Sequence, residues 1–144
     1  LARRLKLNMT IEPGLYHIKN AASWTVLDES TDGEHIVHGW QQANVANQRW
    51  IVSDIGDGNY LIQNEESGSY LHAPEASDGT RLVGSGDSSH WHLHQEGEGW
   101  VYITYPDTGL VVDLHEGQKD DGTPISLWGK NDGAVHQRWF FERL

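Results

Sequence analysis

One phrase of sequence occurs three times in this chain of 144 residues, and the repeat constrains the fold more than any other feature. Each copy opens on a glycine followed by alternating apolar and polar residues. The copies span residues 14–20, 58–64 and 99–105. Alternation of this kind predicts a half-buried β-strand. The spacing of the copies gives a repeat unit of roughly 40–48 residues, so the chain holds three such units.

The remainder of each unit follows one order. A second apolar phrase comes next, then an Asp-Gly turn, a third apolar phrase, and a closing phrase that contains a tryptophan. The Asp-Gly pairs are Asp32-Gly33, Asp78-Gly79 and Asp121-Gly122, and the closing tryptophans are Trp50, Trp91 and Trp139. Asp-Gly favours a tight turn between two strands. Each unit is therefore predicted to hold about four strands and no helix of useful length.

Two closed arrangements accommodate three four-stranded units, a propeller and a threefold barrel. Propellers typically have four or more blades, so three units favour an all-β fold of the β-trefoil type with pseudo-threefold symmetry. In that fold the tryptophan that closes each unit would point into a shared core. We expect Ile51, Leu93 and Phe140 to lie beside these tryptophans.

The domain organisation follows from the repeats. We expect a single domain over residues 11–144, with repeats at about 11–53, 54–95 and 96–144. Residues 1–10 differ in composition, since residues 1–8 hold three of the ten basic residues of the chain. Residues 1–10 are predicted to be an N-terminal arm or an expression remnant, since Met9, directly after residues 1–8, could be a natural start.

Charge and cysteine content exclude several functions. The formal net charge is −11, which disfavours nucleic acid and anionic membrane surfaces as partners. The chain has no cysteine, so disulfides, thiolate metal sites and cysteine nucleophiles are impossible. No apolar run reaches the length of a membrane-spanning helix, and no signal peptide is visible, so no membrane insertion and a cytoplasmic location are expected. No cofactor is predicted, and no pattern indicates an oligomeric state.

The motif Gln-x-Trp closes the first and third repeats, as Gln48-Arg49-Trp50 and Gln137-Arg138-Trp139, whereas the middle repeat keeps only Trp91. From about Ile11 to Leu144 the sequence resembles the ricin B-type lectins, and fungal members in particular. The resemblance implies a β-trefoil and one sugar site per repeat. Each site would combine an aspartate after the second strand, an aromatic platform, and amide or imidazole side chains in the following loop. Such a set suits a pyranose, which offers an apolar face and fixed hydroxyl groups.

Two of the three repeats carry these residues. The third repeat is complete, with Gln137 expected either to brace the aspartate or to touch sugar; its set is Asp113, Trp128, Asn131, His136 and Gln137. The first repeat has fewer residues between aspartate and platform, and its set is Asp28, Trp40, Asn44, Asn47 and Gln48. The middle repeat has His72, Ser85 and Ser89 at the corresponding positions, and we interpret it as degenerate. If Trp128 were instead a core residue, Asp113 would be only a residue of a turn.

The expected function is non-catalytic binding of glycans or glycoproteins through hexose units, of galactose or N-acetylgalactosamine type or of mannose type. One alternative is a trefoil that acts through protein contacts, as a protease inhibitor or as an accessory protein like the light subunit of mushroom tyrosinase. Another is a glycosidase using a carboxylate pair, for which Glu65 and Glu66, Glu96 and Glu98, or Asp120 and Asp121 are the candidates. A zinc site on His90, His92 and His94 is a further possibility, since alternation would place the three imidazoles on one face of a strand.

Overall fold

The computed structural model describes residues 11–95 and 99–144. These residues form twelve strands and three single-turn 3₁₀ segments. The strands are β1 (Gly14–Asn20), β2 (Val26–Glu29), β3 (Val37–Trp40), β4 (Trp50–Gly56), β5 (Asn59–Asn64), β6 (Tyr70–His72), β7 (Val83–Ser85), β8 (Trp91–Gln95), β9 (Val101–Thr104), β10 (Leu110–Leu114), β11 (Thr123–Gly129) and β12 (Trp139–Arg143). The 3₁₀ segments are η1 (Ala46–Gln48), η2 (His115–Gly117) and η3 (Val135–Gln137). The predicted N-terminal arm, residues 1–10, lies outside the described residues.

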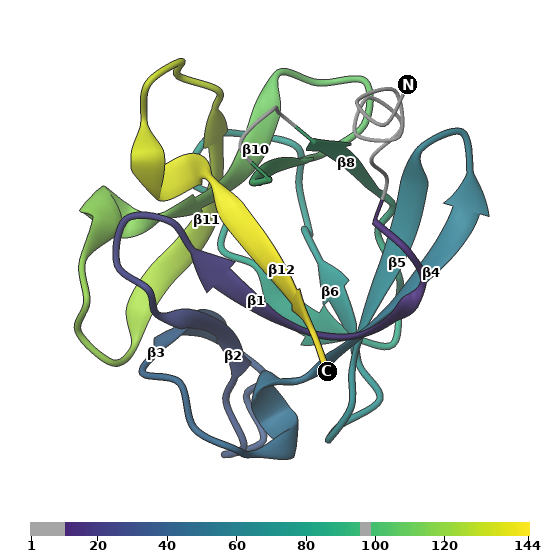
Figure 1. Ribbon diagram of the computed structural model, residues 1–144, viewed down its shortest axis with the longest axis vertical. Coiled ribbons are helices and arrows are strands. Elements are labelled where there is room, and N and C mark those ends of the chain that lie inside the picture. The colour runs from purple at the N-terminus through teal and green to yellow at the C-terminus, as the bar shows by residue number, and fades with distance from the viewer. Residues whose placement is uncertain (1–10, 96–98) are drawn as a thin grey trace, which may run out of the picture.

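Antiparallel pairing closes a barrel from β1, β4, β5, β8, β9 and β12, in that order around the ring. Figure 1 shows β1 and β12 side by side across the centre of the molecule. The other six strands form the hairpins β2–β3, β6–β7 and β10–β11. The hairpins also contact one another, through Gly39 and Thr123, Ile36 and Val83, and Arg81 and Ser126. A barrel capped by three hairpins is the predicted β-trefoil.

The three closing tryptophans lie in the core, as predicted. Trp50, Trp91 and Trp139 are each fully buried. Each indole Nε1–H donates a 3.0 Å hydrogen bond to a backbone carbonyl of the neighbouring hairpin, at Leu27, Leu71 and Val112 respectively. A buried indole needs such an acceptor, since its N–H would otherwise lose its water contacts without replacement. The core tryptophans therefore hold the first strand of each hairpin, β2, β6 or β10, in place.

The prediction of which residues pack beside these tryptophans in the core is confirmed for one residue of three. Leu93 is nearly buried, but Ile51 is 38% exposed and Phe140 is only partly buried. Successive side chains of a strand point to opposite faces, so the residue directly after a buried tryptophan faces outward. The inward neighbours lie two positions on, at Val52, Leu93 and Phe141.

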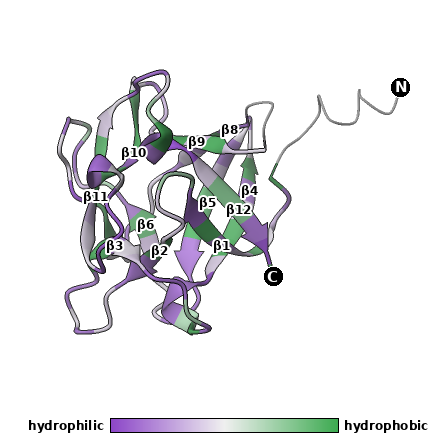
Figure 2. Cartoon of the chain, turned by 60° about the vertical axis from the view of Figure 1, so that its left-hand side comes forward, coloured by the Kyte–Doolittle hydropathy of each residue, from purple (hydrophilic) through white to green (hydrophobic). Residues whose placement is uncertain are grey.

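Hydrophobic residues follow the strands, whereas the loops that connect them are mostly hydrophilic, as Figure 2 shows. The glycines of the predicted turns adopt a positive φ, for example +93° at Gly33 and +90° at Gly122. Glycine reaches this conformation without a steric cost, which explains its place in the turns. No described helix is long and apolar enough to cross a membrane.

Candidate functional site

The first-repeat site lies on hairpin β2–β3 and the loop that follows it. Asp28 on β2 pairs with His38 on β3, and Val26 pairs with Trp40 two positions away. Residues two apart on one strand share a face, so His38 and Trp40 point to the same side as Asp28. Register alone thus brings the predicted carboxylate and the predicted aromatic platform together.

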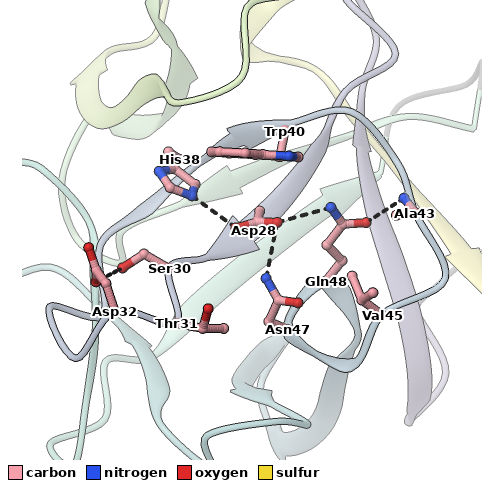
Figure 3. Close-up of a pocket in the computed structure, with 10 residues that line it drawn as sticks. All are labelled: Asp28, Ser30, Thr31, Asp32, His38, Trp40, Ala43, Val45, Asn47 and Gln48. Carbon is pink, nitrogen blue, oxygen red and sulfur yellow. Dashed lines mark hydrogen bonds and ion pairs between the residues drawn. The ribbon is translucent and has the colours of Figure 1, made fainter.

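The Asp28 carboxylate is buried and holds three hydrogen bonds (Figure 3). Its Oδ1 lies 2.9 Å from Nε2 of His38. Its Oδ2 accepts from Nδ2 of Asn47 at 3.1 Å and from Nε2 of Gln48 at 2.9 Å. A carboxylate has about four acceptor positions, so roughly one remains for a ligand, on Oδ1.

Gln48 braces the site from below. Its amide N–H groups reach Asp28 and the carbonyl of Gln41, at 2.9 and 3.1 Å. Its carbonyl accepts from the backbone N–H of Ala43 at 2.8 Å, as drawn in Figure 3. Because Gln48 is buried and its donors are both in use, it positions the aspartate and the loop and leaves ligand contact to its neighbours.

Trp40 forms the exposed wall of the site. Its side chain is 38% exposed, and its ring centroid lies 5.0 Å from that of His38 at an interplanar angle of 39°. The depression beside it has a volume of about 540 Å³. Its lining is Asp28, Ser30, Thr31, Asp32, His38, Trp40, Ala43, Val45, Asn47 and Gln48. An aromatic face beside a carboxylate can stack on the apolar side of a sugar ring and accept from its hydroxyl groups.

The third repeat builds the same frame on β10–β11. Asp113 pairs with Ser126, and Val111 pairs with Trp128, whose side chain is 42% exposed. Gln137 donates to Oδ2 of Asp113 at 2.9 Å and to the carbonyl of Gly129 at 3.1 Å. It also accepts from the backbone N–H of Asn131 at 2.9 Å. The core tryptophans and the two glutamines therefore hold both aspartates in equivalent ways.

The groups around Asp113 differ from those around Asp28. Nε2 of His136 lies 3.2 Å from Oδ2 of Asp113, where the first repeat has the amide of Asn47. Among the described residues, Oδ1 of Asp113 has no hydrogen-bond partner. Burial raises the pKa of the Asp113 carboxyl above its usual value, although Gln137 and His136 oppose the shift. Burial raises this pKa because a charged carboxylate loses hydration inside the protein.

The middle repeat has the same geometry with different chemistry. His72 pairs with Val83 and Tyr70 pairs with Ser85, so no aromatic platform faces His72. Oγ of Ser89 lies 2.9 Å from Nδ1 of His72 and accepts from the backbone N–H of Ala73. Ser89 thus takes the place of the glutamine on a smaller scale. This repeat has neither the carboxylate nor the aromatic platform of the other two. These residues support the prediction that it does not bind sugar, which stays a prediction.

The roles predicted for two amide side chains, Asn44 and Asn131, stay predictions. Asn44 is exposed and accepts from Nη1 of Arg49 at 3.2 Å, and it does not line the first-repeat depression. Asn131 contributes its backbone N–H to Gln137. His38 is a site residue that the sequence reasoning missed. Its signal was available, since it stands two residues before the predicted platform Trp40 and therefore on the same face.

The alternative chemistries gain no support from the described residues. His92 and His94 lie on β8 with ring centroids 6.4 Å apart. No group of three or more histidine, aspartate or glutamate side chains suited to a metal ion occurs within residues 11–95 and 99–144. Of the carboxylate pairs weighed above, Glu96 and Glu98 lie outside the described residues.

The profile of the family described as "Ricin-type beta-trefoil lectin domain-like" matches residues 4–85 and 47–128. No curated protein gives a significant match.

Solved structures include several similar folds. The ricin B-like lectin of Macrolepiota procera, in complex with lactose, is 30% identical with a TM-score of 0.87, and the match covers 94% of this chain and 100% of that one. The Rhizoctonia solani agglutinin is 25% identical with a TM-score of 0.85, over 94% and 99% of the two chains. The Polyporus squamosus lectin, bound to Neu5Aca2-6Galb1-4GlcNAc, is 25% identical with a TM-score of 0.79, over 94% of this chain and 51% of that one.

Proposed function

The chain belongs to the ricin-type β-trefoil lectin family, and we propose that it binds hexose units of glycans, without catalysis, through its first and third repeats. The observation that carries the proposal is the pairing of a braced carboxylate with an exposed tryptophan, found twice. Asp28 faces the same side as Trp40, and Asp113 the same side as Trp128. A stable fold does not require either tryptophan to be exposed.

The chemistry of a pyranose matches these two sites. Its apolar face stacks on the indole, and its hydroxyl groups donate to the carboxylate. In the first site, His38 and Asn47 complete the polar rim. In the third site, His136 lies beside the carboxylate. Sites of this kind are shallow and individually weak, so a glycan that reaches two of them on one chain would gain avidity.

Galactose or N-acetylgalactosamine units are the proposed ligands, with mannose as the other hexose. Two of the similar structures support the first choice, since one lectin is bound to lactose and another to a sialylated galactose epitope. Both of these ligands contain galactose. Glycoproteins that carry such units are the proposed partners.

A glycan array with the wild-type protein tests the function directly. Trp40→Ala and Trp128→Ala then test the two platforms, and each should weaken binding at its own site by about threefold to tenfold, since ring stacking contributes about 0.5–1.5 kcal/mol. Trp100→Ala is the matched control, because Trp100 lies outside both sites against Tyr102 and Arg138. An array without any bound sugar would overturn the proposal and favour a role through protein contacts, for which a protease inhibition panel is the assay. Turnover of nitrophenyl glycosides would contradict the non-catalytic assignment.

A further inference from the structure

Trp24 has an unusual backbone conformation for its size. It lies in the turn between β1 and β2 with φ of +63°, and its N–H donates to the carbonyl of Asn20 at 2.9 Å. The middle repeat makes the same turn with Gly68, at φ +76°, whose N–H donates to the carbonyl of Asn64 at 2.9 Å. A positive φ is a genuine outlier for a bulky residue, and such strain clusters at functional sites. The turn itself therefore favours glycine, and the tryptophan needs another reason.

The Trp24 side chain is fixed but not buried. Its ring stacks on Phe140, with centroids 5.4 Å apart and planes at 28°, and Nζ of Lys19 lies 5.4 Å from its centroid. Despite these contacts the side chain is 55% exposed. The result is a pre-oriented aromatic surface that is open to solvent.

Packing of Trp24 on Phe140 is not a requirement of the fold. By repeat position, Ile51 corresponds to Phe140, since each follows the closing tryptophan of its repeat. The turn that corresponds to that of Trp24 then carries Gly68, which has no side chain to cover Ile51. Ile51 remains 38% exposed there. The trefoil thus tolerates an uncovered residue at this place, so covering Phe140 does not explain Trp24.

Trp24 lines a depression of about 400 Å³ whose other walls are polar. Its lining is Ser23, Trp24, Thr25, Gln41, Lys119 and Asp121. Oδ1 of Asp121 accepts from the backbone N–H of Gln41 at 2.8 Å, and its Oδ2 has no partner among the described residues. Lys119 makes no ion pair within the part of the chain that the structure describes. An aromatic face, a carboxylate oxygen and an ammonium group are a set that can hold a sugar ring by stacking and by hydrogen bonds to its hydroxyls.

This depression lies next to Trp40, because Trp40 pairs with Val26, and the chain neighbours of that pair, Gln41 and Thr25, both line it. Trp40 lines the first-repeat depression, and the next residue, Gln41, lines the depression at Trp24. We propose that Trp24, Lys119 and Asp121 form a subsite for the second sugar ring of a glycan whose first ring lies on Trp40. The inference rests on the proposed function and adds to it a preference for oligosaccharides over monosaccharides.

Calorimetric titration of Trp24→Gly with galactose and lactose tests the subsite. Glycine is the chosen replacement because it occupies the equivalent turn in the middle repeat and suits the positive φ. Asp113→Asn serves as the background, so that the first-repeat site dominates the signal. We expect the parent to bind lactose more tightly than galactose. Trp24→Gly should weaken lactose binding by about fivefold and leave galactose binding unchanged, a loss in the range of one aromatic stacking contact.

Two further variants keep the test discriminating. Trp24→Phe should retain most of the preference for lactose, and Lys119→Ala should reduce it without a change in Tm. An unchanged lactose-to-galactose ratio in Trp24→Gly, or an equal fall for both sugars with a lower Tm, would overturn the subsite and leave Trp24 a structural residue. If the array selects mannose, mannose and α-1,2-mannobiose replace the pair. Failure of the wild type to bind any sugar would instead refute the proposed function itself.

Discussion

The first and third repeats hold an aspartate in the same frame but surround it differently. In both, a core tryptophan donates a hydrogen bond to the backbone carbonyl of the residue before the aspartate, and a buried glutamine donates to the carboxylate. Asp28 then receives two more donors, His38 and Asn47, whereas Asp113 lies beside His136 alone. The two repeats thus share this frame but differ at two equivalent positions. One is His38 in the first repeat and Ser126 in the third, and the other is Asn47 in the first repeat and His136 in the third. The residues at these positions decide which donors each carboxylate has.

The surroundings of Asp113 have an electrostatic consequence. Each hydrogen bond to a carboxylate favours its charged form, and burial opposes it. At Asp113 burial prevails and raises the pKa of the carboxyl above its usual value. The third site therefore loses its charged acceptor at a higher pH than an ordinary aspartate would.

Removal of the bracing glutamine should have the largest effect. Gln48→Ala removes one of the three donors to the Asp28 carboxylate and takes away the partner of the Gln41 carbonyl and of the Ala43 N–H. We expect the free energy of unfolding to fall by about 3 kcal/mol, since each buried unsatisfied group costs roughly 1–3 kcal/mol and the cavity admits some water. Gln137→Ala should lower the free energy of unfolding by a similar amount, because Gln137 has three equivalent partners in the third repeat. Chemical denaturation measures both.

Gln118→Ala is the control for these variants. Gln118 is exposed, so this variant should unfold at the same denaturant concentration as the wild type. A loss in only one of the two glutamine variants would show that the repeats do not share a frame. The first and third repeats would then hold their aspartates in different ways.

Neutralising one aspartate at a time should separate the two sites. Asp28→Asn should weaken first-site binding by about tenfold or more, and Asp113→Asn should do the same for the third site, since a hydrogen bond to a charged group contributes roughly 1.5–3 kcal/mol. Titration with galactose should show half of the sites remaining in each variant. His72→Asn in the middle repeat is the matched control and should leave the number of sites unchanged. One variant that abolishes all binding would contradict two independent sites.

The sequence was sufficient for the fold and for the main pairs of the site, for identifiable reasons. Three copies in phase determine a threefold barrel, and strand register then places Asp28 with Trp40 and Asp113 with Trp128. The sequence was not sufficient for the roles of single side chains. Whether Gln48 touches a ligand depends on three partners around it, and the amide oxygen of Asn44 is taken by Nη1 of Arg49. The misplaced Ile51 and Phe140 were an avoidable error, because strand alternation assigns them to the outer face.

Acidification should weaken the third site before an ordinary aspartate would lose its charge. The raised pKa means that Asp113 takes up a proton at a higher pH than usual, and a protonated carboxyl is a poorer acceptor. In an Asp28→Asn background, galactose affinity should therefore fall as the pH is lowered from 7. The midpoint of this fall should lie above pH 3.8, the usual pKa of an aspartate. A midpoint at or below 3.8 would contradict the effect of burial.

The same shift affects folding, with a definite sign. A group whose pKa is raised in the folded state stabilises it at low pH, and this contribution is lost as pH rises through that pKa. Ionised Asp113 thus lowers stability at neutral pH. Asp113→Asn should raise Tm at pH 7 and change it less at pH 3, as differential scanning calorimetry at both values would show.

Exchange of the residue opposite the aspartate should have the smallest effect, and it tests directly what that position contributes to each site. Ser126 pairs with Asp113 as His38 pairs with Asp28. Ser126→His adds a donor beside Asp113, so it should move the midpoint of the pH profile downward while galactose affinity at pH 7 changes by about twofold at most, as expected for a neutral hydrogen bond near 0.5 kcal/mol. Ser126→Ala, which adds no donor, should leave the midpoint in place. If Ser126→His fails to move it although Asp113→Asn abolishes the pH dependence, the donor set would not control the carboxylate, and the raised pKa would follow from the shape of the longer hairpin instead.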